Sequence, residues 1–270
     1  MSQKRQPVIE CPKQTSAVTT LTYEFVHGHV IPAHFHHEDQ LVYACRGVMT
    51  VRTGSGIWVV PPQRAVWIPA RTPHGIRMSG AVSMRTLYLR PGIVRVLPRT
   101  CCVLNVPALL QELIIHVCTI GTLSGKSNSQ AHLIHVLIDQ LEIVQTVGLQ
   151  LPSPKDVRAA RVAAMLRRNV GNTSLQTVCR HAGASKRTIE RIFLQETKLS
   201  VGKWRQQLRL LRSLELLAAG EKISYAALEA GYSTPSAFVA MFRKALGTTP
   251  RRYFENSLQA NSTRASARSH

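Results

Sequence analysis

The first third of the chain alternates short apolar runs with turn residues. Runs such as Leu41–Cys45, Val48–Val51 and Ile57–Val60 contain four or five residues, and glycine or proline separates them. Strands of this length and spacing are typical of an antiparallel sandwich or a small barrel. The pattern between residues 20 and 92 therefore predicts a β domain.

Helical spacing replaces this pattern over residues 104–118 and 130–147. The second segment carries an apolar stripe whose members recur at intervals of three and four residues: Leu133, Leu137, Leu141 and Val144. Such a stripe lies on one face of a helix. It either joins two copies of the chain or packs back onto the β domain.

Two similar helix–turn–helix patterns follow a Leu-Pro-Ser-Pro segment at residues 151–154, which we interpret as a linker. In the first pattern, Gly183 follows Cys179 by four residues. In the second, Gly231 follows Ala227 by four residues. Each glycine permits the left-handed turn that a compact corner between two helices needs. The repeat predicts two DNA-binding units of the same type.

Charge separates the two halves of the chain. The chain has 34 Lys and Arg against 14 Asp and Glu, a net charge of +20. Residues 1–150 carry a net +6 and residues 151–270 a net +14. A basic half with two helix–turn–helix patterns indicates a nucleic-acid partner. The long helix predicted over residues 201–219 adds a row of arginines with the spacing needed to contact phosphates.

Outward-facing residues of the two second helices and of the arginine row are the candidate DNA contacts. Arg187 and Arg191 lie four residues apart, so they share a helix face, and arginine can donate two hydrogen bonds to guanine. The alternatives are that both arginines contact only phosphates, or that Glu190 pairs with Lys186. The full candidate set is Lys186, Arg187, Glu190, Arg191, Arg205, Arg209, Arg212, Ser236, Ala240 and Arg243.

These motifs resemble a known family. Residues 154–256 resemble the DNA-binding domain of AraC-type transcriptional regulators in three segments: Gly183–Phe193, Trp204–Leu211 and Gly231–Pro250. The Trp204-Arg-Gln-Gln sequence is similar to the subgroup of the 2-nitroimidazole efflux repressor, which has an N-terminal cupin sensor domain. The resemblance implies a homodimer that binds double-stranded DNA and a small-molecule effector and controls an efflux transporter gene. The chain departs from the family at Cys179, where alanine is usual.

Three histidines and a glutamine in the N-terminal half resemble the cupin pattern. His34 and His36 are two residues apart and lie on one face of a strand, and Gln40 and His74 follow. Glutamate usually stands at the position of Gln40 in metal-binding cupins, so the anionic metal ligand is missing here. We therefore expect the four residues to line an effector pocket. The alternative is a divalent metal on His34, His36 and His74.

Together these patterns predict a two-domain α+β protein. Its expected parts are a cupin-like β-barrel over residues 1–98, a helical dimerisation segment over 99–151, an AraC-type DNA-binding domain over 152–256 and a disordered tail over 257–270. No apolar run is long enough to span a bilayer, and residues 1–13 lack the apolar core of a secretory signal. We expect a cytoplasmic regulator without a membrane partner that is not an enzyme. The alternative is a cupin metalloenzyme, a dioxygenase or isomerase, with a DNA-binding appendage.

Overall fold

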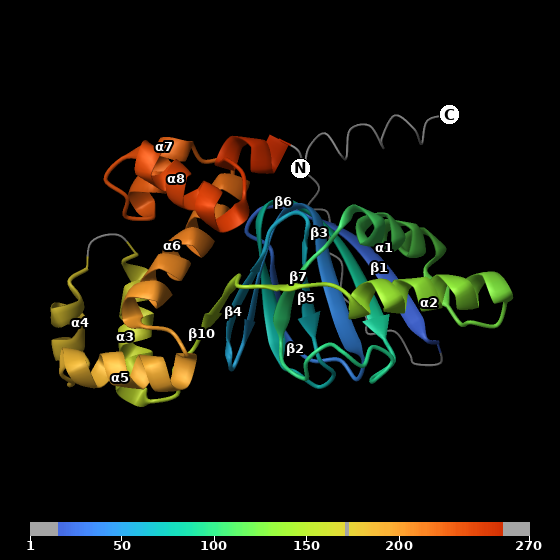
Figure 1. The fold of residues 1–270 in the computed structure, drawn as a ribbon, viewed down its shortest axis with the longest axis horizontal. Coiled ribbons are helices and arrows are strands. Elements are labelled where there is room, and N and C mark those ends of the chain that lie inside the picture. The colour runs from blue at the N-terminus through green and yellow to red at the C-terminus, as the bar shows by residue number, and fades with distance from the viewer. Residues whose placement is uncertain (1–15, 171–172, 256–270) are drawn as a thin grey trace, which may run out of the picture.

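The computed structural model describes residues 16–170 and 173–255, with a sheet-rich N-terminal part and a helical C-terminal part (Figure 1). The tail predicted over residues 257–270 lies outside the described residues. The strands are β1 (Val18–Phe25), β2 (Val30–His34), β3 (Asp39–Thr53), β4 (Gly56–Val60), β5 (Arg64–Ile68), β6 (His74–Leu89), β7 (Cys102–Asn105), β8 (Thr122–Leu123), β9 (Thr146–Val147) and β10 (Gln150–Pro152).

The two long strands β3 and β6 organise the sheet. They pair antiparallel from Asp39 opposite Leu89 to Thr53 opposite His74, and the other strands extend the sheet in the order β8-β1-β6-β3-β5-β7-β9. The apolar runs predicted as strands all lie in strands. The two runs on either side of Gly47, however, belong to one strand. The pairing register of β3 with β6 shifts around Gly47, so this glycine forms a bulge within β3 and does not end it.

Two helices cover one side of the sheet: α1 (Ala108–Ile120) and α2 (Asn128–Glu142) (Figure 1). Leu137 and Leu141 of the predicted stripe are fully buried in the same cluster as Leu41 and Trp67 of the sheet. The stripe therefore packs back onto the barrel. The predicted start of the first helix, at residue 104, was wrong, because residues 102–105 form β7. The predicted end of the second helix, at residue 147, was also wrong, because residues 146–147 form β9.

The C-terminal part consists of two helical units joined by a long helix. The helices are α3 (Val157–Arg168), α4 (Leu175–His181), α5 (Lys186–Thr197), α6 (Val201–Ala218), α7 (Ile223–Glu229) and α8 (Pro235–Leu246). Trp204 of α6 packs edge-on against Phe193 of α5, with 5.5 Å between the ring centroids, and Phe238 and Phe242 are buried in the second unit. As Figure 1 shows, the two units lie toward opposite ends of α6.

The first half of the segment interpreted as a linker, Leu151 and Pro152, is part of the sheet. Strand β10 pairs with β4, with Leu151 opposite Ile57, and the carbonyl of Pro152 accepts a 2.8 Å hydrogen bond from the Trp204 indole. Near the other end of α6, Gly80 of β6 lies directly against the backbone of Ala218. The barrel and the helical part are therefore packed together along α6. Across residues 16–170 and 173–255, no helix has both the length and the hydropathy that crossing a bilayer requires.

Candidate functional site

The two helix–turn–helix units have the same hydrogen bonding at their turns. In each unit, one turn amide bonds back three residues to a carbonyl and the next bonds back five: Gly183 to Arg180 (3.1 Å) and Ala184 to Cys179 (3.1 Å), and Gly231 to Leu228 (2.8 Å) and Tyr232 to Ala227 (2.9 Å). Both glycines have positive φ, 71° and 77°. The predicted repeat is therefore a repeat of backbone structure.

Helix α5 presents a polar face to solvent. Ser185 caps the helix by accepting a 3.1 Å hydrogen bond from the amide of Thr188. Lys186, Arg187, Glu190 and Arg191 are all exposed, whereas Ile189, Ile192 and Phe193 face inward and are buried.

Three of these four exposed α5 side chains contact a partner on the same helix. The Lys186 ammonium lies 3.7 Å from the Glu190 carboxylate, and Arg191 donates a 3.3 Å hydrogen bond to Gln195. The Arg187 side chain forms no hydrogen bond or ion pair among the described residues, so a ligand can engage its guanidinium without displacing a protein partner. Both contacts lie at the surface and are screened by solvent, so breaking them to contact DNA costs little free energy.

Helix α8 has shorter outward side chains. Thr234 caps it by accepting a 3.2 Å hydrogen bond from the amide of Ala237, and Pro235 occupies the first turn. Ser236, Ala240 and Arg243 are exposed along one side. Small residues let a helix approach DNA closely but offer few hydrogen-bond donors. Arg243 is thus the candidate on α8 with the longest reach.

The three arginines predicted as a row on α6 have different surroundings. Arg205 is half-buried, and burial followed by the charge of Arg209 lowers its pKa. The Arg209 guanidinium lies 5.8 Å from the ring centroid of Tyr232, in the range of a cation–π contact. Arg212 forms a 3.2 Å ion pair with Glu215. The spacing of three residues between Arg212 and Glu215 was the sequence signal for this pair.

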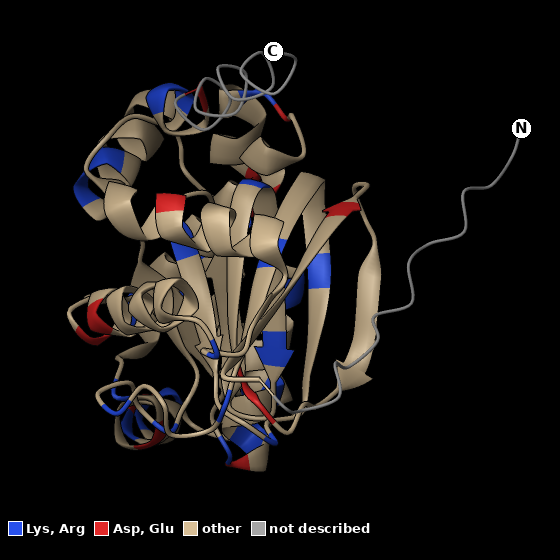
Figure 2. Ribbon diagram, turned by 90° about the vertical axis from the view of Figure 1, so that its right-hand side faces the viewer, with Lys and Arg blue, Asp and Glu red and all other residues tan. Residues whose placement is uncertain are grey.

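Basic residues are concentrated away from the helices that cover the barrel. Helices α1 and α2, which face the viewer in Figure 2, contain no Lys or Arg. By contrast, α5 and α6 carry exposed or half-buried basic residues, and Arg243 and Lys244 are in the last turn of α8. The more basic half of the sequence thus includes the helices that carry the candidate DNA contacts.

The barrel brings three of the predicted histidines together. His34 at the end of β2 pairs in register with His74 at the start of β6, and their ring centroids are 4.4 Å apart. His36 follows β2, with its ring 4.8 Å from that of His34 and 5.4 Å from that of His74. One ring nitrogen from each histidine lies within 4.8 Å of the others.

Backbone carbonyls fix the orientation of two imidazoles. Nδ1 of His34 donates to the carbonyl of Pro32 at 2.7 Å, and Nδ1 of His74 donates to the carbonyl of Thr72 at 2.9 Å. A neutral imidazole has one N–H, so Nε2 of each ring is left as an acceptor. Burial, with the nearby histidines as lesser causes, lowers the pKa of His36 to about 4, and burial lowers that of His74 to about 4. These two rings are therefore neutral at pH 7.

Gln40 and Tyr88 complete the surroundings of the histidines. The Gln40 amide nitrogen donates a 3.0 Å hydrogen bond to Thr86, while its Oε1 is buried without a hydrogen-bond partner among the described residues. The same holds for Nε2 of His74. Tyr88 is opposite Gln40 in the sheet, and its ring lies 4.8 Å from that of His36. Tyr88 was not among the residues predicted for this site, although it follows Thr86 by two residues in β6 and therefore lies on the same face of the strand.

Comparison with known proteins agrees with both parts of the structure. Residues 20–142 match the family described as AraC-like ligand binding domain, and residues 178–256 match the family described as helix-turn-helix domain. The HTH-type transcriptional regulator NimR of Escherichia coli strain K12 is 33% identical over 225 residues, which cover 82% of this chain and 81% of NimR.

Two further similarities are more limited. The HTH-type transcriptional regulator RipA of Corynebacterium glutamicum is 37% identical over 101 residues, covering 37% of this chain and 30% of RipA. The crystal structure of unsaturated fatty acid bound ToxT from Vibrio cholerae is 12% identical and covers 90% of this chain and 96% of that chain, with a TM-score of 0.37.

Proposed function

The chain belongs to the AraC-type transcriptional regulators, with a ligand-binding barrel and a helix-turn-helix DNA-binding domain, and from this premise we propose which residues perform each task. Helices α5 and α8 enter two successive segments of the major groove, about one helical turn apart. The matched turns at Gly183 and Gly231 are the observation that carries this proposal, because they give the two helices the same role in two equivalent units.

We assign base recognition mainly to α5. Arg187 and Arg191 contact guanines and Glu190 accepts from cytosine, each contact contributing roughly 1–3 kcal/mol of discrimination. Lys186, Ser236, Ala240 and Arg243 approach the backbone or base edges. Arg205 and Arg209 contact phosphates at the edge of the interface. Arg212 is less suited to this role than the sequence indicates, because Glu215 already neutralises it.

We infer that the effector binds inside the barrel at His34, His36, Gln40 and His74. The two buried acceptors without partners among the described residues, Nε2 of His74 and Oε1 of Gln40, require hydrogen-bond donors when a ligand fills the site. Neutral imidazoles favour a neutral ligand with N–H or O–H groups. The effector class that fits is therefore a small donor-bearing organic molecule with a ring or apolar face for Tyr88.

A divalent metal is the competing occupant of the histidine cluster. Three imidazoles with mutually close nitrogens suit zinc or nickel. The cluster holds no carboxylate, so nothing in it offsets the charge of the cation or supplies a general base. For this reason we also propose that the protein is a regulator without enzymatic activity. We propose separately, from the family resemblance, that it acts as a homodimer in the cytoplasm.

The test is DNA selectivity of the purified chain. Genomic fragments retained by the protein are sequenced, and the affinity for one retained duplex is compared with that for a scrambled duplex at the same salt concentration. A specific regulator prefers its site by roughly a thousandfold or more. Equal affinity for both duplexes would contradict base readout and favour a nonspecific nucleic-acid-binding protein. Retained metal together with turnover of a small molecule would favour the cupin enzyme.

A further inference from the structure

A cavity of about 660 Å³ lies in the barrel beside the end of β5, and none of the four residues of the proposed effector pocket lines it. Its wall comes from the start of β3 and from the connections that follow β5 and β6. Trp67 in this wall lies opposite Leu41 in the sheet and packs in the cluster that α1 and α2 cover. Gln40, the neighbour of Leu41, points to the other face of the sheet. The cavity is therefore separate from the histidine cluster.

The connection between β6 and β7 is fixed against the rest of the barrel where it forms the wall. The indole of Trp67 donates a 3.2 Å hydrogen bond to the carbonyl of Pro98, and the amide of Arg95 donates a 3.4 Å hydrogen bond to Glu142 of α2. Val94, between these two points, is buried in the same cluster as Trp67. Because the wall is already formed, a ligand does not have to order it on binding.

Asp39 contributes a buried carboxylate to this cavity. The residue is only 8% exposed, and its two carboxylate oxygens accept hydrogen bonds from the amides of Ala70 (2.8 Å) and Gly92 (3.2 Å). Among the described residues, no basic side chain forms an ion pair with Asp39. Each carboxylate oxygen has two lone pairs, so each can accept one further hydrogen bond. A buried carboxylate without a cation is costly, so a ligand that brings a positively charged donor stabilises it.

Arg95 and Arg99 add positive charge to the lining of the same cavity. Both residues are exposed, and their side chains form no hydrogen bond or ion pair with the described residues, Asp39 included. Solvent screens exposed guanidinium groups, so they offset the charge of the buried carboxylate only partly. The wall also includes the apolar side chains of Trp67 and Leu97. A ligand with a positive group, a negative group and an apolar body matches all of these features.

We propose that this cavity binds a small amphoteric molecule with an apolar body, of the amino acid class. The protonated amine donates to Asp39, the acid group pairs with Arg95 and Arg99 at the rim, and the apolar body contacts Trp67 and Leu97. The volume is in the range of ordinary small-molecule sites. The site goes beyond the proposed function, because it depends on neither the DNA contacts nor the histidine cluster.

The test uses three probes that share one apolar body. Phenylalanine has both the amine and the acid group, phenethylamine has only the amine, and 3-phenylpropionate has only the acid. Isothermal titration of the full-length protein measures their affinities. We expect phenylalanine to bind roughly tenfold or more tightly than either of the others, because each of them loses one charge-assisted contact.

Two variants assign each charge of the probe to its partner. Asp39→Asn keeps the shape of the side chain without its charge, so phenylalanine should then bind no more tightly than 3-phenylpropionate. Arg95→Gln combined with Arg99→Gln should instead make phenylalanine bind no more tightly than phenethylamine. Asparagine can accept from only one of the two amides that Asp39 now satisfies, so the melting temperature of this variant is measured as well. If Asp39→Asn does not fold, the exposed arginine pair and the three probes still decide the proposal.

Matched controls locate the effect in this cavity. Arg90→Gln removes an exposed arginine of the same connection outside the cavity and should leave the affinity for phenylalanine unchanged. His34→Ala combined with His74→Ala should also leave it unchanged, because these residues line the other pocket.

Three results would overturn the proposal. One is absence of phenylalanine binding at millimolar concentration, and another is equal binding of phenylalanine and either single-charge probe to the wild type. The third is binding that survives the cavity substitutions but is lost in the histidine variant. DNA selectivity would be unaffected by any of these results, so failure here is distinguishable from failure of the proposed DNA-binding function.

Discussion

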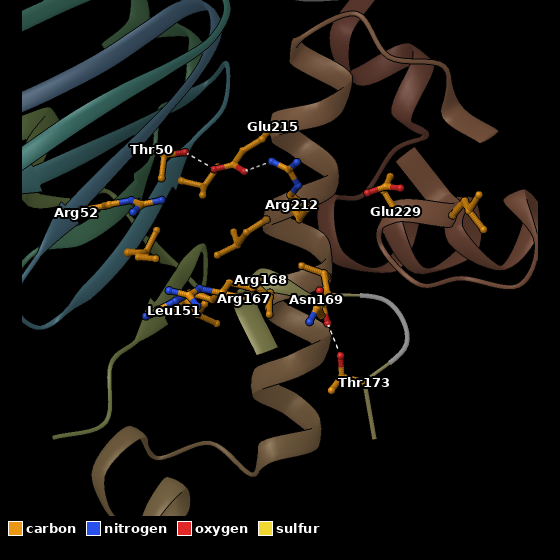
Figure 3. A pocket seen from close by; sticks show the side chains of 16 residues that line it. Thr50, Arg52, Leu151, Arg167, Arg168, Asn169, Thr173, Arg212, Glu215 and Glu229 are labelled. Atoms are coloured by element: carbon orange, nitrogen blue, oxygen red, sulfur yellow. Dashed lines mark hydrogen bonds and ion pairs between the residues drawn. The ribbon is translucent and has the colours of Figure 1, made fainter. Parts of the chain in front are cut away.

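At the scale of single residues, the arginines of α6 show how a shared sequence spacing conceals different roles. Arg205, Arg209 and Arg212 recur on one helix face, yet the second stacks on Tyr232 and the third pairs with Glu215. A cation that already has an anionic partner releases few counterions when DNA binds, because its charge is partly neutralised beforehand. The row therefore divides into members that can contact phosphate and one, Arg212, that is paired with Glu215, the residue that accepts a hydrogen bond from Thr50 of the barrel (Figure 3).

The salt dependence of DNA affinity distinguishes these roles. Arg205→Ala should reduce the slope of log affinity against log salt by about 0.9, the value for one phosphate contact. Arg212→Ala should leave this slope nearly unchanged. Both slopes are measured by fluorescence anisotropy on one duplex. Equal reductions in the two variants would contradict the assignment of Arg212 to the barrel interface.

Gln40 decides whether the histidine cluster favours a metal. Gln40→Glu supplies the missing anionic oxygen. Because a bound cation and a buried carboxylate stabilise each other, this substitution should raise zinc affinity by roughly tenfold or more. Gln40→Ala is the control and should not raise it. Isothermal titration of the metal-free proteins gives the affinities. If the wild-type protein binds zinc as tightly as the glutamate variant, the cluster already has all the ligands that zinc needs. That result would contradict the proposal that an organic effector binds there.

At the scale of elements, the sequence predicted which segments are strands and helices better than where they end. The apolar runs marked the strands, but Gly47 marks a bulge because β3 continues to pair with β6 across it. The helical spacing predicted over residues 104–118 begins inside strand β7, because residues 102–105 pair with β5. Long-range pairing of this kind leaves no local signal. The caps at Ser185 and Thr234 were predictable because capping depends on neighbouring residues alone.

The same limit applies to the candidate site. The His34, His36 and His74 cluster was predictable from its motif, whereas the contact of Tyr88 with His36 depends on the register between β3 and β6. Asp39 and Arg95, which line the cavity beside β5, belong to different segments of the chain, so only the fold of the barrel brings them together.

We propose that the homodimer forms through the outer face of α2. Since Leu137 and Leu141 pack onto the barrel, a dimer must use other residues, and Val136 and Ile143 are 42% and 71% exposed. Val136→Glu should place a charge in that interface and convert the dimer to a monomer at micromolar concentration. Val157→Glu, at another exposed helical valine, should not. Light scattering after size-exclusion chromatography measures the mass, and a dimer that survives Val136→Glu would place the interface elsewhere.

At the scale of the whole molecule, the contact between the barrel and α6 couples the ligand-binding part to the DNA-binding part. Thr50 bonds to Glu215, and Gly80 leaves no space for a side chain, since a Cβ there would lie 2.0 Å from the carbonyl oxygen of Ala218. We therefore expect a ligand bound in the barrel to act on the helical part through α6.

Gly80→Ala tests this contact. The new methyl group should force α6 away from the barrel. The free energy of unfolding should then fall by more than the roughly 1–2 kcal/mol that strain at positive φ costs alone, and the melting temperature should fall with it. Gly28→Ala is the matched control, because Gly28 also has positive φ but no atom within 4 Å of the added Cβ. Protease cleavage between the two parts should increase only in the Gly80 variant. Identical melting and cleavage of the two variants would contradict the docked arrangement.

The most direct test of the account is selection of preferred sites by the full-length protein from randomised duplex DNA. We predict that each site contains two preferred segments about 10 base pairs apart, one for α5 and one for α8. Arg187→Ala combined with Arg191→Ala should erase the preference in one segment and leave the other, while Arg243→Ala should affect the other segment. A single preferred segment, or unchanged preferences in both variants, would contradict the claim that two equivalent units read DNA through these helices.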